Sequence, residues 1–548
     1  MSYIPSGPFP VGVCDIEFFN KNLANDNNNG ISPRSHLVGR IFYPTNVEAL
    51  KQKKYQKPCW LPSWTYARGY GAFLTAWGGT SWLKSLLKPV IVGISYSLGH
   101  RSLIDNLMHA PILEGQEPFP VVIFSHGIGG TRNAYSGICS DLTSAGFVVL
   151  AVEHADGTAA TVQLAGKQGA RFYGGWLSEE ERLAQTRYRM GEVGTAYDLL
   201  RALQRREMTE GLRLSSGLDP VAFLGGRLDL DKVSLMGHSY GGATVTALTA
   251  EDGRFRAGVA LDPWWGALPE DSAALNGWQT DAPLLVMGSH TWNTPNDKGR
   301  LFCDGVRQQR VFKAAASRAG AMHLVIEGSS HDTFNDAVML VALRFRSAIN
   351  YARSFKKHKS IAELDASLAL PLVSNAALAF LRRHLALAPG QIRPLDEAMR
   401  ANSERLTSAE ARLAAEASSK GKAGGSADAV ALEAHGESPA PAQEPQHMQG
   451  AEGSTARGAS AEAAGSLAAA AYLRLEGSAD EAGAAAQSGQ GGGELGMRSG
   501  VGTATVQPTA PSQQAPQNTA EATPPDSEVG ALEQVCKGHI WKLDVYGL

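Results

Sequence analysis

Apolar runs and segments of helical periodicity alternate along the chain between about Gly115 and Gly390. Each apolar run is short, is apolar throughout rather than at every second position, and ends in small or polar residues. Such runs, separated by helices, predict an α/β fold with a mostly parallel sheet that helices cover on both faces. The expected strands span residues 119–125, 147–154, 232–237, 255–262, 282–289 and 322–327, and the expected helices include 133–146, 187–207 and 241–251.

Two departures from this pattern indicate the domain organisation. Near the N-terminus, two strand-like segments flank a polar insert from Asn20 to Gly30 that is typical of a surface loop. From about residue 400, the chain consists mainly of Ala, Gly, Ser, Glu, Gln and Pro, which cannot bury enough apolar surface to offset the chain entropy. We therefore expect a folded domain over 1–395, a disordered low-complexity region over 400–530, and a terminal segment, 531–548, that docks on the domain, binds a partner or frays.

Composition and charge exclude several functional classes. The net charge of the 548 residues is −3, so nothing indicates a nucleic-acid partner. The five cysteines are widely spaced and form no zinc pattern, so we expect reduced thiols, a cytoplasmic protein and no metal. The N-terminus does not resemble a signal peptide, and no stretch reaches the roughly 18 to 20 apolar residues of a membrane span.

The sequence Gly237-His238-Ser239-Tyr240-Gly241 occurs where an expected strand becomes an expected helix. A serine on such a turn is crowded, and glycines on both sides relieve the crowding. The helix that follows directs backbone N–H groups toward developing negative charge. A tight structural turn would explain the glycines equally well, but the strand and helix context favours Ser239 as a nucleophile.

A nucleophilic serine needs a base, and the base needs a carboxylate that orients it. The strand after the serine ends in Asp262, which we expect to be this acid. A turn aspartate before proline is the alternative, and Asp281 and Asp297 are the other candidate acids. For the base, His331 follows a strand and a loop of small residues, and we favour it over His290, which also follows a strand.

The segment from His126 to Gly130 supplies a glycine-rich loop between an expected strand and helix. With a catalytic serine, such a loop provides one backbone donor of an oxyanion hole, here the N–H of Ile128, and the N–H of Tyr240 provides the other. A phosphate cradle is the alternative use of a loop of this kind. The loop matches neither the P-loop pattern nor the dinucleotide-binding pattern, and we expect no cofactor.

Four motifs together resemble the platelet-activating factor acetylhydrolase family, in its plasma and intracellular type II branch. They are "SHGIGGTRNAYSGICSDLTSAGFVVLAVEHADGTAA", "GHSYGGAT", "GVALDPW" and "GSSHDTF", and the resemblance covers about Gly7 to Gly390. It implies an α/β-hydrolase that cleaves short or oxidised sn-2 acyl groups from phospholipids without calcium. It also implies Ser239 as nucleophile, Asp262 as acid, His331 as base, and Ile128 and Tyr240 as oxyanion donors.

Members of that family meet lipid through apolar surface helices, which the resemblance extends to a Trp- and Leu-rich segment from Ala72 onward. Its candidate membrane-interface residues are Trp77, Trp82, Leu83 and Leu86, although a core-packing helix explains the same composition. We thus expect a phospholipid substrate and peripheral contact with a lipid surface; the sequence specifies no protein partner. A carboxylesterase acting on a non-lipid ester, or a non-catalytic scaffold with a partner-binding tail, are the alternative functions.

Overall fold

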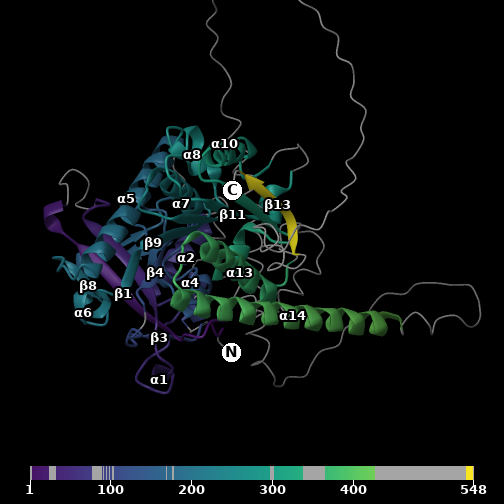
Figure 1. The fold of residues 1–548 in the computed structure, drawn as a ribbon, viewed down its shortest axis with the longest axis horizontal. Helices are drawn as coiled ribbons and strands as arrows, with labels where there is room; N and C mark the ends of the chain where they lie inside the picture. Colours follow the sequence, from purple (N-terminus) through teal and green to yellow (C-terminus); the bar gives the residue numbers. More distant parts are fainter. Residues whose placement is uncertain are drawn as a thin grey trace, which may run out of the picture.

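The computed structural model describes residues 3–23, 32–76, 89–90, 92–93, 96–97, 99–100, 104–115, 117–167, 169–175, 178–295, 301–336, 364–425 and 539–546. A large twisted sheet forms the centre of this part of the chain (Figure 1). Its strands are ordered β13-β12-β11-β10-β9-β4-β5-β2-β1-β3, with β8 paired to β1. From β12 to β5 every neighbouring pair is parallel, which confirms the predicted mostly parallel sheet.

The apolar runs of the sequence form the parallel strands. These are β4 (Phe119–Ser125), β5 (Val148–Val152), β9 (Leu228–His238), β10 (Ala257–Leu261), β11 (Leu284–Ser289) and β12 (Ala321–Ile326). Antiparallel pairs extend the sheet at both sides, through β1 (Val11–Phe19) and β2 (His36–Pro44) at one and β13 (Ile540–Tyr546) at the other. The shorter strands are β3 (Asn106–Met108), β6 (Thr161–Gln163), β7 (Ala170–Phe172) and β8 (Leu212–Leu214).

Both faces of the sheet are buried, because successive side chains of each parallel strand enter different cores. In β4, Val122 and Phe124 pack with α4 and α13, whereas Val121 and Ile123 pack with α5. In Figure 1, α13 and α14 lie on one side of the sheet and α5, α7 and α10 on the other. These helices are α4 (Ser136–Ser144), α5 (Glu179–Gln204), α7 (Tyr240–Glu251), α10 (Gly305–Ala316), α13 (Ala366–His384) and α14 (Pro389–Gly425).

Shorter helices connect these layers. The α-helical ones are α1 (Val47–Leu50), α2 (Trp64–Ala76), α6 (Pro220–Leu224), α8 (Ala273–Asn276) and α9 (His290–Asn293). The 3₁₀ turns are η1 (Lys21–Leu23), η2 (Ala165–Lys167), η3 (Trp265–Ala267) and η4 (His331–Phe334). Among the helices that the structure describes, none is long and apolar enough to cross a membrane.

Ordered structure continues past the boundary that composition predicts at residues 395–400. Helix α14 runs on to Gly425, and Leu406 and Ala409 are buried against the same core as α13. Residues with apolar side chains recur at helical spacing on this face, and burial of that face stabilises a helix whose composition is otherwise low in complexity. The last part of α14 extends away from the sheet in Figure 1. Most of the expected low-complexity region, residues 426–530, lies outside the described residues.

Asp336 fixes the segment after η4 to the start of α4. It is fully buried, and its carboxyl accepts hydrogen bonds from the backbone N–H groups of Ser136 (2.8 Å) and Gly137 (2.9 Å) and from the indole of Trp60 (3.2 Å). Burial disfavours the charged form more strongly than these donors favour it, and it raises the pKa of Asp336 from 3.8 to about 7. The η4 segment is therefore anchored by a carboxyl that gains its charge only near neutral pH.

Asp336 makes the stability of the protein depend on pH. The folded state holds this proton more tightly than the unfolded chain, so its contribution to the free energy of unfolding is greatest below about pH 4 and is lost as the pH rises toward 7. Denaturant titrations at pH 4.5 and 7.5 should show the wild type losing roughly 2 to 4 kcal/mol more than Asp336→Asn over this range. Equal losses in the two proteins would contradict this assignment.

Candidate active site

Ser239 lies in the turn between β9 and α7. Its backbone has φ 56° and ψ −116°, a strained conformation for a residue with a side chain. Two hydrogen bonds hold this backbone in place: the Ser239 N–H donates to Leu261 O (2.9 Å), and the Trp264 N–H donates to Ser239 O (3.0 Å). The predicted strand–serine–helix turn is therefore present, and it is fastened to the strand that carries the candidate acid.

The glycines of the motif are required by close backbone contacts. A Cβ on Gly241 would lie 2.0 Å from Ser125 O, and a Cβ on Gly237 would lie 2.6 Å from Gly241 O. A Cβ on Gly127 would lie 3.0 Å from the Ser239 Cβ, so the glycine-rich loop after β4 runs directly beside the serine. The turn and the loop thus approach each other more closely than larger residues would permit.

Asp262 and His331 are brought together as predicted. The Nδ1–H of His331 donates to Asp262 Oδ2 at 2.7 Å, and the Asp262 side chain is 1 % exposed. Ser289, at the end of β11, donates to the same carboxylate from its backbone N–H (2.8 Å) and its hydroxyl (2.6 Å). Because Nδ1 carries the donated proton, Nε2 of the neutral ring is free to accept another.

His331 begins η4 and is held on two sides by aromatic rings. The indole of Trp292 stacks on it in parallel, with ring centroids 3.6 Å apart and an interplanar angle of 4°. The ring of His238, the residue before the candidate nucleophile, lies 4.5 Å away. These two rings restrict the orientation of the His331 imidazole. The imidazole remains partly open to solvent, with 21 % of the side chain exposed.

The alternative acids and base occupy other positions. Asp281 is 87 % exposed and pairs with Arg318 at 2.9 Å on the surface. His290 begins α9, and its Nδ1 accepts a hydrogen bond of 3.4 Å from the Gly328 N–H. Asp297 lies outside the described residues. Of the residues weighed for these roles and described by the structure, Asp262 and His331 are the pair that meets beside Ser239.

The expected oxyanion donors lie at the serine. Around Ile128, the N–H of Gly129 donates to Thr158 O (2.8 Å) and that of Gly130 to Gly127 O (3.1 Å). No acceptor for the Ile128 N–H is found among the described residues, and Tyr240 is the first residue of α7, where a helix leaves its N–H groups unsatisfied. Gly129 has φ 69°, and the Phe73 ring fills the space that a Cβ there would enter. The loop therefore packs against Phe73 at Gly129 and runs beside Ser239 at Gly127.

A hydrogen-bonded chain joins the oxyanion loop to the loop of His331. The Gly127 N–H donates to the hydroxyl oxygen of Tyr135 (3.2 Å), and the Tyr135 hydroxyl donates to Nδ1 of His238 (2.9 Å). Nε2–H of His238 then donates to the backbone carbonyl of His331 (3.0 Å). Burial, together with the neighbouring His331, lowers the pKa of His238 well below 6.5, so its ring is neutral and can accept from Tyr135.

Tyr135→Phe is expected to lower kcat about tenfold with little change in KM, because it leaves two buried polar groups unpaired without touching bound substrate. Tyr188→Phe is the matched control, since the Tyr188 hydroxyl has no hydrogen-bond partner among the described residues. Steady-state kinetics of both variants test the prediction. An unchanged kcat in Tyr135→Phe would show that this chain does not position the site.

Sequence reasoning missed Tyr135 and also Arg189. The Arg189 guanidinium is fully buried, donates to His126 O (2.5 Å), pairs with Asp156 (2.9 Å) and lies 4.4 Å from the centroid of the Tyr240 ring. It thereby fixes the strand end before the oxyanion loop and the residue after Ser239. The sequence predicts that Arg189 lies in the helix 187–207. No local pattern predicts its contacts with His126, Asp156 and Tyr240, which are distant along the chain.

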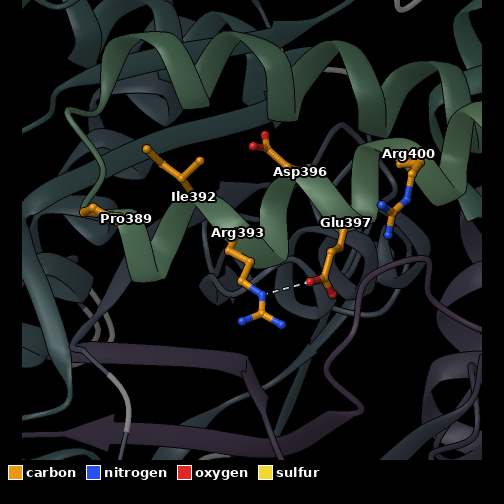
Figure 2. A pocket seen from close by; sticks show the side chains of 6 residues that line it. All are labelled: Pro389, Ile392, Arg393, Asp396, Glu397 and Arg400. Carbon is orange, nitrogen blue, oxygen red and sulfur yellow. Dashed lines mark hydrogen bonds and ion pairs between the residues drawn. The ribbon is translucent and has the colours of Figure 1, made fainter.

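A surface groove of about 460 Å³ lies away from these residues, along α14 (Figure 2). Arg393 and Glu397 form an ion pair across one turn at 3.1 Å, and Asp396 pairs with Arg382. Its lining contains no serine, cysteine or histidine, so we do not assign the groove to the site. Its lining residues are Pro389, Ile392, Arg393, Asp396, Glu397 and Arg400.

The candidate membrane-interface residues Trp77, Trp82, Leu83 and Leu86 lie outside the described residues. Helix α2, which ends just before them at Ala76, reaches the oxyanion loop through Phe73. Past the candidate acid, Trp265 is fully buried in the core and Trp264 is partly buried beside Tyr240. Within the described ranges, no group of three or more His, Cys, Asp or Glu residues is placed to hold a metal ion.

A serine on a strained strand-to-helix turn, a histidine paired with a strand-end aspartate and a parallel sheet between helices define an α/β-hydrolase. The sequence profile of a family described as "Platelet-activating factor acetylhydrolase, isoform II" matches residues 3–404. The chain belongs to this family. The predicted family and fold class are thus confirmed.

Three relatives, two acetylhydrolases and one esterase, agree with this assignment. The platelet-activating factor acetylhydrolase of Bos taurus is 31% identical over 395 residues, which cover 70% of this chain and 77% of that protein. That of Cavia porcellus is 29% identical over 391 residues, with the same two coverages. A probable 1-alkyl-2-acetylglycerophosphocholine esterase of Arthroderma benhamiae is 25% identical, covering 61% of this chain and 75% of its own. A solved ferulic acid esterase from Streptomyces cinnamoneus has a TM-score of 0.47 and 20% identity, covering 71% of this chain and 95% of its own.

Proposed function

We propose that this chain is a serine hydrolase that removes short or oxidised sn-2 acyl groups from phospholipids, without calcium, through an acyl-Ser239 intermediate. The observation that carries the proposal is the 2.7 Å contact between Asp262 and His331 beside the strained turn of Ser239. Membership of the acetylhydrolase family and the esterase named among the relatives support the substrate class.

In the first half of the reaction, the Ser239 hydroxyl oxygen attacks the sn-2 carbonyl carbon. Nε2 of His331 takes the serine proton, and Asp262 holds the imidazole by Nδ1 and stabilises its cation. The carbonyl oxygen becomes an oxyanion that the N–H groups of Ile128 and Tyr240 stabilise, at about 3 kcal/mol per donor. As the intermediate collapses, His331 returns the proton to the lysophospholipid oxygen, and the ester bond breaks.

In the second half, water takes the place of the alcohol. His331 removes a proton from the water, which attacks the acyl-Ser239 carbonyl and forms a second oxyanion at the same donors. Collapse returns the proton to Ser239 and releases the carboxylic acid. The Trp292 ring stacked on His331 keeps the imidazole in position through both halves.

Two further features extend the proposal to the setting of the reaction. Trp77, Trp82, Leu83 and Leu86 supply peripheral contact with a lipid surface. The compartment is the cytoplasm, which the free thiols of Cys14, Cys59, Cys139 and Cys303 suit.

Hydrolysis of 1-alkyl-2-acetylglycerophosphocholine should be compared with that of a long-chain phosphatidylcholine and a soluble aryl acetate, each with and without a calcium chelator. The proposal predicts that kcat/KM for the 2-acetyl lipid exceeds that for the long-chain lipid by about a hundredfold and is unchanged by the chelator. Activity on the aryl ester alone would instead favour a carboxylesterase. Activity on none of the three would favour a scaffold.

A further inference from the structure

The C-terminal segment of the chain forms the outer strand of the catalytic sheet. Strand β13 pairs antiparallel with β12, with Leu543 opposite Leu324 and Tyr546 opposite Ala321. Residues 426–539 separate α14 from β13, so β13 reaches β12 from a distant part of the sequence. Without β13, the buried strand β12 would present a row of unpaired backbone groups, which is a strong site for strand addition.

Side-chain contacts fasten β13 at both ends. Tyr546 stacks on Phe312 of α10, with centroids 4.5 Å apart and an interplanar angle of 6°. At the other end, Nε2 of His539 lies 2.8 Å from the Glu410 carboxylate on α14. Between them, Leu543 packs against the large core that α13 covers. Side chains of this segment thus contact α10, α14 and the core.

The pairing continues beyond β12 into the loop that carries His331. The Glu327 N–H donates to the His539 carbonyl at 2.9 Å, four residues before His331. The next residue, Gly328, accepts a hydrogen bond of 2.8 Å from the Leu364 N–H. The loop is therefore held from two sides, and one of these sides is the segment that leads into β13.

Both β13 and its partner Glu410 lie beyond residue 404, where the family match ends. We propose that β12, α10 and the middle of α14 form a strand-docking site for the chain's own segment 539–546, and that its occupation holds the His331 loop in the active geometry. The segment acts as a separate ligand of the domain, able to bind from outside the chain. The effect of the docked segment on activity rests on the proposed role of His331 as the base. The docking of the segment does not depend on that role.

Two full-length variants test the proposal. Leu543→Asp places a charge against the core, whereas Val545→Asp places the same charge on a side chain that is 38% exposed. Leu543→Asp should lower kcat/KM at least tenfold and increase hydrogen exchange over residues 321–331, and Val545→Asp should change neither. A labelled synthetic peptide of residues 537–548 should bind Leu543→Asp by fluorescence anisotropy, and at saturation it should restore activity.

Each outcome has a defined meaning. Unchanged exchange in Leu543→Asp, or no binding of the peptide to it, would overturn the docking site. Increased exchange with unchanged activity, or peptide binding without recovery of activity, would overturn its effect on the His331 loop. A peptide that carries the same Leu543→Asp change should neither bind nor restore. If the wild-type chain shows no esterase activity at all, the proposed function fails, while exchange and peptide binding still decide whether β13 docks.

Discussion

Replacing Ser239 by alanine is expected to lower kcat for ester hydrolysis by about 10⁶-fold. The oxygen that attacks the carbonyl is then missing, and the remaining oxyanion donors and binding contacts accelerate attack by water only weakly. Because Ser239 is buried and its backbone is held by Leu261 and Trp264, the smaller alanine should keep the turn. Initial rates of acetate release from the 2-acetyl lipid measure the effect.

Ser317→Ala provides the control for this experiment. Ser317 is an exposed serine that ends α10, and its hydroxyl donates to Ala314 O at 2.6 Å. Its loss should leave kcat unchanged. A Ser239→Ala enzyme that retains a substantial part of the wild-type rate would show that another group forms the acyl intermediate or that water attacks directly.

Asp262→Asn is expected to lower kcat by about 10⁴-fold. The Ser289 N–H keeps the amide oxygen at the position of Oδ1, so the amide NH2 group replaces Oδ2 and cannot accept the Nδ1–H of His331. The imidazole then adopts the other tautomer, and Nε2 no longer accepts the serine proton. Ser289 should keep the side chain in place through its N–H, so the loss should arise from chemistry rather than from unfolding. Circular dichroism of the variant beside its kcat separates the two causes.

Asp281→Asn tests the acid assignment from the other direction. Asp281 was a candidate acid in the sequence, but it is exposed and paired with Arg318 on the surface. Its replacement should leave kcat close to wild type. A large loss in Asp281→Asn, or near-normal activity in Asp262→Asn, would mean that Asp262 does not orient the base.

The strand–serine–helix turn and the meeting of Asp262 with His331 were predictable because each residue follows a local pattern at the end of an apolar strand. In a parallel sheet those ends share one edge, so residues far apart in sequence, such as Ser239, Asp262 and His331, meet there. The same argument placed the Ile128 loop beside Ser239. Long-range hydrogen bonds connect Tyr135 to His238 and Arg189 to the backbone of His126. No spacing of residues in the sequence predicts these partners.

The C-terminal part of the chain was less predictable for a different reason. Composition marked residues after 400 as low in complexity, yet the helical recurrence of Leu395, Ala398, Leu406 and Ala409 buries one face of α14. Composition averages over this periodicity and therefore obscures it. Docking of β13 depends on pairing with β12 more than 200 residues earlier, and an apolar terminal segment alone does not specify its partner.

Covalent labelling shows whether Ser239 is the activated nucleophile. Wild-type protein should be treated with a fluorophosphonate probe and digested, and the modified peptide sequenced by mass spectrometry. The account predicts stoichiometric labelling at Ser239, prevented by an excess of the 2-acetyl lipid and absent from Ser239→Ala. An unlabelled wild type, or a label on another residue that persists in Ser239→Ala, would contradict it.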